Sequence, residues 1–378
     1  MDLALTPEQE MLKTTAREFV ANECPQALVR DLDEKGDGFS RDLWQKMARL
    51  GWMGVIIPPE YGGGGHTYTD LGVLYEEMGK GALPSPHHSS AVLCALILLK
   101  GGSEQQCKEL LPAVARGELV LALAATEPDY GWDPIDIQLR AEARGSGYAL
   151  DGTKLFVHDA QIADTLIVAA RTREAPDPAV GISLFLVDRT TPGVTVRVAD
   201  GWTGERQNEV IFKDVTVPAD RVVGGIDEGW PVLAQAYLPA TAALCAYMVG
   251  GLQEVYERTV SYSRTRQQFG VAIGTFQRVQ DRVVEVVNYL DSARWTTYEA
   301  LWKLDTDPEH AAEAVSIAKA VTSEAYDEGT FSSHEVHAGI GISKEYGLHL
   351  YTKKARTLFN YLGDPTYHRN KIAQMLAL

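Results

Sequence analysis

The order of hydrophobic patterns along the 378 residues is the feature that most constrains the fold. Helical periodicity fills the first 118 residues, short apolar runs separated by turn residues occupy 119–228, and helical periodicity returns over 229–378. Helical stretches of crossover length are missing between the short runs, which disfavours a parallel sheet. We therefore predict an α+β chain with an N-terminal helical domain (1–118), a central antiparallel β-barrel or sandwich domain (119–228) and a C-terminal helical bundle (229–378).

Local signals support the helical and β predictions. Thr6-Pro7-Glu8-Gln9 combines an N-cap, a proline at the first helical position and a capping-box glutamine. Ser40 is the candidate N-cap of a second helix. Asp151-Gly152 lies between two apolar runs and predicts the turn of a β-hairpin.

Composition excludes several function classes. The formal charge of -16 at pH 7 would repel nucleic-acid phosphates and anionic lipid headgroups. We expect no apolar run near the roughly 20 residues that span a bilayer, and the first residues lack the profile of a signal peptide. The four cysteines, Cys24, Cys94, Cys107 and Cys245, lie far apart, which disfavours a disulfide framework or a metal site. We expect a soluble, cytoplasmic protein that binds neither nucleic acid nor membranes.

Three short motifs stand out, although each has an ordinary structural interpretation. Thr126-Glu127-Pro128 leads to Gly131-Trp132-Asp133, which alone is a strand entering a turn. Arg266-Gln267-Gln268-Phe269-Gly270 closes one long helix before Phe276-Gln277 opens the next, as a glycine C-cap with an aromatic plug would. His337-Ala338-Gly339-Ile340-Gly341 is a glycine turn that permits close backbone approach, or simply ends a helix.

The order and spacing of these motifs resemble the acyl-CoA dehydrogenase family over essentially the full length. Residues 58–65 look like the family's "P-x-x-Y-G-G" loop, and Lys154-Leu155-Phe156-Val157 stands where the family has "K-x-W-I". The resemblance implies a flavoprotein of lipid metabolism with FAD as cofactor and acyl-CoA as substrate. It also implies an electron-transfer flavoprotein as electron acceptor and a homo- or heterotetramer.

In the family, the adenosine diphosphate half of FAD reaches a neighbouring subunit. The resemblance assigns Arg266, Phe269, Gln277 and Gly339 to this neighbour-facing side, where a guanidinium and backbone donors suit a pyrophosphate. Glu335 stands where the family has glutamine. A carboxylate there would face the anionic half of the cofactor unless it turns away or finds a cation.

The flavin ring of the family lies against the β domain, and this ring-facing side has changed in our sequence. Thr126 and Gly131 are retained. Trp132 replaces a small serine, Phe156 replaces a tryptophan and His158 replaces a hydroxyl residue. Trp132 in particular would occupy space that the flavin uses.

Family members remove the substrate α-proton with a glutamate while a hydride leaves the β-carbon for the flavin. The glutamate usually lies in "Y-E-G-T", and the corresponding stretch here, Tyr361-Leu362-Gly363-Asp364, places Leu362 at that position. Other branches carry it on the helix before R-x-x-F-G, where this chain has Ala240-Thr241, and their nearby arginine is missing too. Losing a positioned base typically costs about 10² to 10⁴ in rate. We therefore expect the isolated chain to be inactive in ordinary dehydrogenation.

Three residues are candidate substitutes for the base. Asp364 follows Leu362 by two positions, and His87 and His88 lie in a loop that should approach the acyl end of the cavity. Their ordinary interpretation is a surface turn and two solvated imidazoles.

Two patterns carry no function. The four glycines at 62–65 lack the preceding strand and the following lysine of a phosphate-binding loop. His334-Glu335-Val336-His337 spaces its histidines by three residues, unlike the H-E-x-x-H zinc motif. We expect no metal.

The asymmetry between the two sides favours one hypothesis: a base-lacking subunit of a bacterial heteromeric acyl-CoA dehydrogenase, completing the FAD site of a base-containing partner. Tyr367-His368-Arg369 also resembles the degenerate subunits of such complexes. The alternatives are a self-sufficient acyl-CoA flavoenzyme with a non-standard base and a non-enzymatic scaffold of the same fold.

Overall fold

The computed structural model describes residues 4–35, 38–199, 201 and 207–378. These residues form two compact units, each made of separate chain segments. The helical unit contains the described residues within 1–35, 67–84 and 241–378, and the β unit contains those within 36–66 and 85–240. The α+β class is confirmed, with helical regions on either side of a β region in the sequence. The exact division at 118 and 228 stays a prediction.

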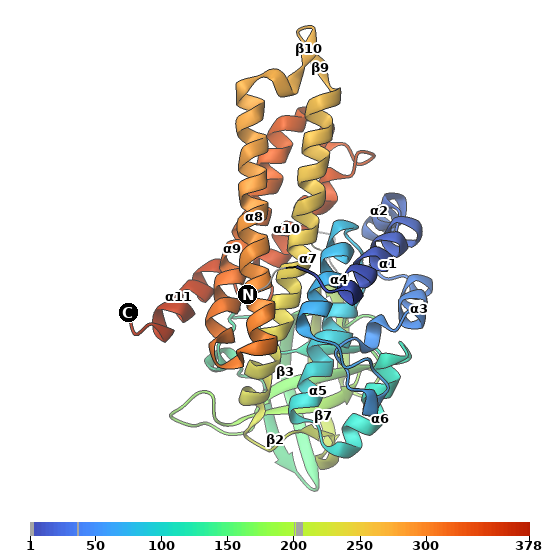
Figure 1. The fold of residues 1–378 in the computed structure, drawn as a ribbon. Coiled ribbons are helices and arrows are strands. Elements are labelled where there is room, and N and C mark those ends of the chain that lie inside the picture. The colour runs from blue at the N-terminus through green and yellow to red at the C-terminus, as the bar shows by residue number, and fades with distance from the viewer. Residues whose placement is uncertain (1–3, 36–37, 200, 202–206) are drawn as a thin grey trace. The chain divides into compact units, whose positions relative to one another are not determined.

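The helical unit is built mainly from long helices (Figure 1). The helix α7 (Gly229–Thr265) contributes its part beyond residue 240. The other elements are α1 (Pro7–Glu23), α2 (Gln26–Lys35), α4 (Tyr68–Lys80), α8 (Gln277–Thr306), α9 (Ala311–His337), α10 (Leu348–Asn360), α11 (Pro365–Met375), and the short strands β9 (Gln267–Gln268) and β10 (Val271–Ala272). Figure 1 shows β9 and β10 at the end of the α7 and α8 pair.

The predicted start of α1 is confirmed. Thr6 Oγ1 accepts a hydrogen bond from Gln9 N at 3.2 Å, and Gln9 Oε1 accepts one from Thr6 N at 3.0 Å. This reciprocal pair satisfies two backbone donors that the first turn leaves unpaired. Ser40 likewise caps α3 (Arg41–Arg49) in the β unit, as expected.

Two glycines allow the α4 and α7 backbones to touch. A Cβ atom on Gly79 would lie 1.9 Å from Tyr247 O, and one on Gly250 would lie 1.8 Å from Glu76 O. Real Cβ atoms do not approach a carbonyl oxygen this closely. The close contact brings the buried carboxylates of α4 within reach of cations on neighbouring helices.

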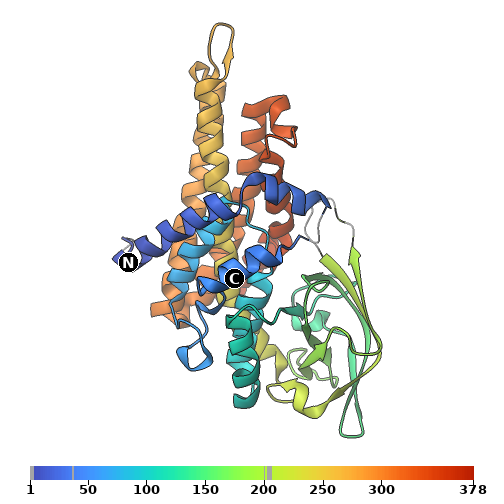
Figure 2. The ribbon, with the colours of Figure 1, turned by 90° about the vertical axis from the view of Figure 1, so that its right-hand side faces the viewer.

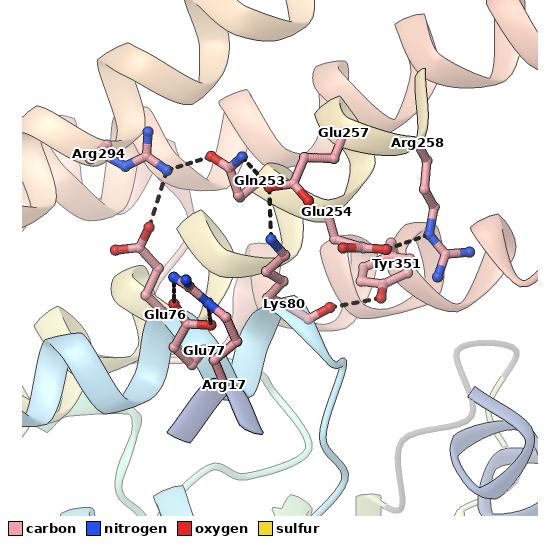
Figure 3. A network of polar contacts seen from close by, with 10 residues as sticks. All are labelled: Arg17, Glu76, Glu77, Lys80, Gln253, Glu254, Glu257, Arg258, Arg294 and Tyr351. Carbon is pink, nitrogen blue, oxygen red and sulfur yellow. Dashed lines mark hydrogen bonds and ion pairs between the residues drawn. The ribbon is translucent and has the colours of Figure 1, made fainter. Parts of the chain in front are cut away.

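A network of ion pairs and hydrogen bonds joins the helices α1, α4, α7, α8 and α10 (Figure 3). Each carboxylate has a guanidinium or ammonium partner, and Tyr351 donates to Lys80 O at 2.8 Å. The pairs are Arg17–Glu77 (2.9 Å), Arg294–Glu76 (3.1 Å), Lys80–Glu257 (2.7 Å) and Arg258–Glu254 (2.9 Å). A cavity of about 290 Å³ lies beside this network and shares several of these side chains. The charged side chains that line the cavity already form ion pairs with one another or with other residues of the network. The network therefore explains how the helices pack and gives no indication of a bound ligand.

The expectation of no membrane-length apolar segment is wrong for α7. By length and composition this helix could cross a membrane, yet 78% of its most apolar 18-residue window is buried within the protein. Many of its residues are alanine, which packs closely against other helices and also raises the apolar average. A buried core helix passes the same test as a membrane span, so α7 is weak evidence for a membrane.

The β unit contains one eight-stranded, mostly antiparallel sheet, which Figure 2 shows as a curved layer. Its order is β6-β7-β3-β2-β4-β5-β8, with β1 pairing β4 in parallel. The strands are β1 (Leu121–Ala124), β2 (Arg140–Arg144), β3 (Gly147–His158), β4 (Thr165–Arg171), β5 (Ile182–Asp188), β6 (Val194–Ala199), β7 (Gln207–Pro218) and β8 (Val222–Val223). The helices are α3, α5 (Ala95–Gly101), α6 (Glu104–Ala115), the π-helix η3 (His87–Cys94) and the start of α7.

The hairpin predicted at Asp151-Gly152 is wrong. These residues lie inside the continuous strand β3, and the hairpin turn is at residues 145–146, where Arg144 pairs with Gly147. Gly152 instead marks an irregularity in the pairing of β3 with β7. Its φ is 144°, and a Cβ atom there would lie 2.9 Å from Leu139 Cγ, which explains why glycine occurs at this position without a turn.

Candidate functional site

The ring-facing side of the β unit is organised by a buried ion pair between two of the sequence motifs. Lys154 Nζ donates to Glu127 Oε1 at 2.6 Å and to Ala125 O at 2.9 Å. The same carboxylate oxygen accepts the backbone N–H groups of Gln138 and Leu139, each at 2.8 Å. Burial lowers the pKa of Lys154 to about 8, against the opposing effect of Glu127. The pair fixes the Thr126-Glu127-Pro128 turn against β3 and against residues 138–139, which precede β2.

A bulge in β3 turns Phe156 outward. The pairing with β7 shifts between Lys154 and Val157, and Phe156 has a φ of 54°, in the left-handed region. Its ring is 39% exposed and meets the ring of Tyr130 edge-on, with centroids 5.2 Å apart. The ring of Trp132 also meets the ring of Tyr130 edge-on, with centroids 5.1 Å apart. The structure thus brings Trp132 and Phe156 together through Tyr130, which the sequence did not single out.

The other ring-facing candidates have local partners. Thr126 is half-buried, and its carbonyl accepts from Leu155 N at 2.9 Å. Gly131 lies against the Asp136 carboxylate, where a Cβ would come within 2.0 Å. His158 ends β3, with its Nε2 3.2 Å from Gln207 Nε2.

The two histidines proposed as substitute bases are not solvated, so that expectation is wrong. His87 is 1% exposed, and its Nε2 lies 3.0 Å from Trp52 O. His88 is partly buried, and its Nε2 lies 2.8 Å from Ala240 O. Burial lowers the pKa of each imidazole to about 4, which keeps both neutral at pH 7. Both rings join backbone segments of the β unit.

The Arg266–Gly270 motif forms a hairpin rather than a helix C-cap. The helix α7 ends at Thr265, β9 and β10 pair, and Phe269 and Gly270 make the two-residue turn with φ values of 53° and 83°. Two consecutive left-handed residues match a type I′ turn. Phe269 is therefore 93% exposed at the tip, not a plug within the chain.

The neighbour-facing candidates lie on the surface of the helical unit. Arg266 and Gln277 are exposed, and among the described residues no hydrogen bond or ion pair involves either side chain. The helix α8 has Phe276 as its N-cap residue, without a side-chain cap, so its first N–H groups have no capping side chain as partner. Gly339 is exposed, and a Cβ there would meet nothing within 4 Å.

Glu335 forms an ion pair with a cation on the neighbouring helix α8. Its carboxylate makes a short ion pair with Arg282 Nε, and Arg282 also contacts Glu285. One guanidinium is thus shared by two carboxylates. The Glu335 carboxylate is therefore paired with a cation of its own chain, so it would not face an anionic cofactor as an unpaired charge.

The base position lies in the loop between α10 and α11. Leu362 has a φ of 59°, an uncommon conformation for a residue other than glycine. Asp364 is the N-cap of α11, and its Oδ1 accepts from Tyr367 N at 2.7 Å. This cap role gives Asp364 a structural explanation.

Sequence reasoning missed Lys319, which is fully buried beneath this loop. It interrupts an apolar stretch of α9, and a single lysine at such a position was the available signal. Sequence reasoning also missed Arg171, whose guanidinium donates to four backbone carbonyl groups of the β unit. Among the described residues no cluster of three or more His, Cys, Asp or Glu side chains is placed to hold a metal.

Three family models match the chain: acyl-CoA dehydrogenase N-terminal domain over residues 6–118, middle domain over 122–215 and C-terminal domain over 227–377. The chain belongs to the acyl-CoA dehydrogenase family. It is 30% identical to an L-prolyl-[peptidyl-carrier protein] dehydrogenase of Serratia sp., covering 100% of this chain and 99% of that protein. It is 27% identical to the caffeyl-CoA reductase-Etf complex subunit CarC of Acetobacterium woodii, covering 98% of each.

Among solved structures, the FAD complex of PigA matches with a TM-score of 0.93 and 28% identity, covering 100% of both chains. Acyl-CoA dehydrogenases are FAD-dependent. The neighbour-facing residues here fit a phosphate-bearing cofactor, because Arg266 and the uncapped start of α8 offer a guanidinium and backbone N–H groups. The ring-facing side offers Phe156, which is 39% exposed, but the Tyr130 ring packs against Phe156 and Trp132 packs against Tyr130.

Removing one member of the buried Lys154–Glu127 pair should lower the free energy of unfolding much more than replacing both members. Lys154→Met leaves the Glu127 carboxylate buried without a cation, and we expect a loss of about 3–5 kcal/mol in the free energy of unfolding. Lys154→Met combined with Glu127→Gln should recover most of this loss. Urea unfolding measures both, with the exposed Lys213→Met as control. Additive losses in the double variant would contradict the assignment.

Acid should destabilise the fold through its buried histidines. The unfolded chain binds a proton on His87 near pH 6.5, whereas the folded pKa is about 4, so stability is lost as pH falls through this window. We expect His87→Gln, which keeps a donor for Trp52 O, to remove roughly 2–3 kcal/mol of this loss by pH 4.5. Urea unfolding at pH 7 and 4.5 measures it.

His310 provides the control, since Asp307 raises the pKa of that exposed imidazole. His310→Gln should therefore not reduce the acid loss. Equal acid loss in wild type and His87→Gln would refute the role of His87.

Proposed function

We propose that this chain is a cytoplasmic subunit of a flavin-dependent acyl-CoA dehydrogenase, which lacks its own catalytic base and completes the FAD site of a base-containing partner. The complex would desaturate an acyl-CoA thioester between its α and β carbons. FAD, when bound, supplies the acceptor for the hydride.

The observation that carries the proposal is the leucine at the base position, together with the engagement of every candidate substitute. Leu362 has no proton acceptor. Asp364 caps α11, His87 binds Trp52 O and His88 binds Ala240 O. Each candidate has a structural reason to be present, which favours the absence of a base over its replacement.

The second support is the contrast between the two sides. Arg266, Gln277 and Gly339 are exposed and positioned to contact another molecule. On the ring-facing side, Trp132 packs against Tyr130 where the family has a small residue. In the proposed complex, this chain would bind the pyrophosphate of the partner's FAD through Arg266 and the start of α8.

An electron-transfer flavoprotein is the proposed acceptor of electrons from the complex. The CarC relative is named as a subunit of a complex with Etf, which supports this assignment. The Serratia relative is named for a prolyl group on a peptidyl-carrier protein, so the substrate panel should include carrier-bound acyl groups beside acyl-CoAs.

Co-expression with a base-containing family member encoded nearby should give a yellow complex with one flavin per pair of chains. In this chain, Arg266→Ala should lower the flavin content of the complex because it removes a phosphate contact. Thr126→Ala should leave the content unchanged, since the proposal gives the ring-facing side of this chain no flavin. Absorbance at the flavin band against protein concentration measures both. One flavin per chain would refute the subunit role, and a colourless complex would favour a scaffold.

One observation favours a self-sufficient enzyme as second candidate: His88 lies against Ala240, where other family branches carry their base. The chain purified alone would then be yellow and be bleached by an acyl-CoA. His88→Gln keeps a donor for Ala240 O but accepts no proton, and should slow bleaching by about 10² to 10⁴. Asp364→Asn and His87→Gln test the other two candidates. Bleaching that none of the three slows would remove all of them as bases.

A further inference from the structure

Lys319 forms an unusual contact beneath the loop that contains the base position. Its ammonium donates to three backbone carbonyls: Leu358 O at 3.1 Å, Phe359 O at 2.9 Å and Gly363 O at 2.9 Å. Ser323 Oγ is a fourth acceptor at 2.8 Å, so the three N–H groups of the ammonium are shared among four oxygens. The last carbonyls of a helix lack internal partners and carry partial negative charge, so a cation is favourable there. Lys319 thus caps the end of α10 from another helix and extends the cap to Gly363.

A second side chain holds the same loop from α11. His368 is 5% exposed, and its Nε2 donates to Leu362 O at 3.0 Å. The carbonyls of residues 362 and 363 are therefore both bound by buried side chains. The backbone of Leu362 itself has a left-handed conformation, which is unfavourable for an L-residue.

Burying the Lys319 ammonium is energetically unfavourable, which argues that its contacts with the loop have a role. Among the described residues, no carboxylate forms an ion pair with its ammonium. The titratable groups around it are Cys245 on α7, Asp364 at the start of α11 and His368. Burial lowers the pKa of Lys319 to about 8, so most molecules hold a buried cation at pH 7. An apolar side chain would fill this space without a buried charge.

We infer that Lys319 and His368 are positioning residues, which together hold residue 362 in its left-handed conformation and keep the base-position loop preformed although the carboxylate is absent. The inference rests on the proposed function only in identifying residue 362 with the base position. The loop contacts themselves are independent of flavin and partner.

Hydrogen–deuterium exchange of the full chain tests the inference. Lys319→Met should lower the protection of the amides of residues 359–364 at least about tenfold, because the loop carbonyls lose a charged donor. Leu362→Asn in that background should restore most of the protection, since asparagine tolerates the left-handed region. Lys344→Met, which removes an exposed lysine of the same unit, is the control and should change nothing in this loop.

The Asn rescue distinguishes positioning from a general structural role. Exchange that rises throughout α9 and α10, without rescue by Leu362→Asn, would overturn the inference. If Lys319→Met does not fold, the pair His368→Leu and His368→Gln replaces it: leucine should deprotect the loop and glutamine, which keeps a donor, should not. Equal protection in both would also overturn it. Failure of the proposed function appears separately, in the flavin content of the complex.

Discussion

The buried pair of Lys154 and Glu127 is the interaction on which the ring-facing side depends. One carboxylate oxygen binds the ammonium and two backbone N–H groups, so a single group joins the end of β1, the middle of β3 and the segment before β2. A charge buried this deeply is tolerated only when its partners are complete. The bulge that exposes Phe156 follows directly after Lys154 in the chain and depends on the same anchoring.

Lys319 is likewise a buried cation, in the helical unit, but its partners differ from those of Lys154. Lys154 has a carboxylate as partner, whereas Lys319 has backbone carbonyls and one hydroxyl. Both cations bind backbone carbonyls at or just beyond the end of a regular element, β1 for Lys154 and α10 for Lys319, and both are themselves fully buried. Buried lysines therefore hold irregular backbone in two loops, one in each unit.

The sequence predicts the class of fold well because periodicity and caps are local signals. The Thr6 cap and the strand-rich middle follow from neighbouring residues alone. The hairpin at Asp151-Gly152 could not be excluded that way, since the bulge there depends on Leu139 and on pairing with β7. Likewise, the exposure of Phe269 depends on pairing of β9 with β10, and the burial of His87 on a distant carbonyl of Trp52.

The candidate residues could be found through motifs, but the conformation of the loop that contains residue 362 could not. A leucine at residue 362 is visible in the sequence, whereas its left-handed backbone and the two side chains that bind its loop are not. A loop that had merely lost its base would be free to relax into a conformation suited to leucine. This one retains a buried cation and a strained residue instead. Under the proposed division of labour, the loop stays ordered because the subunit must still fit a partner whose own site is complete.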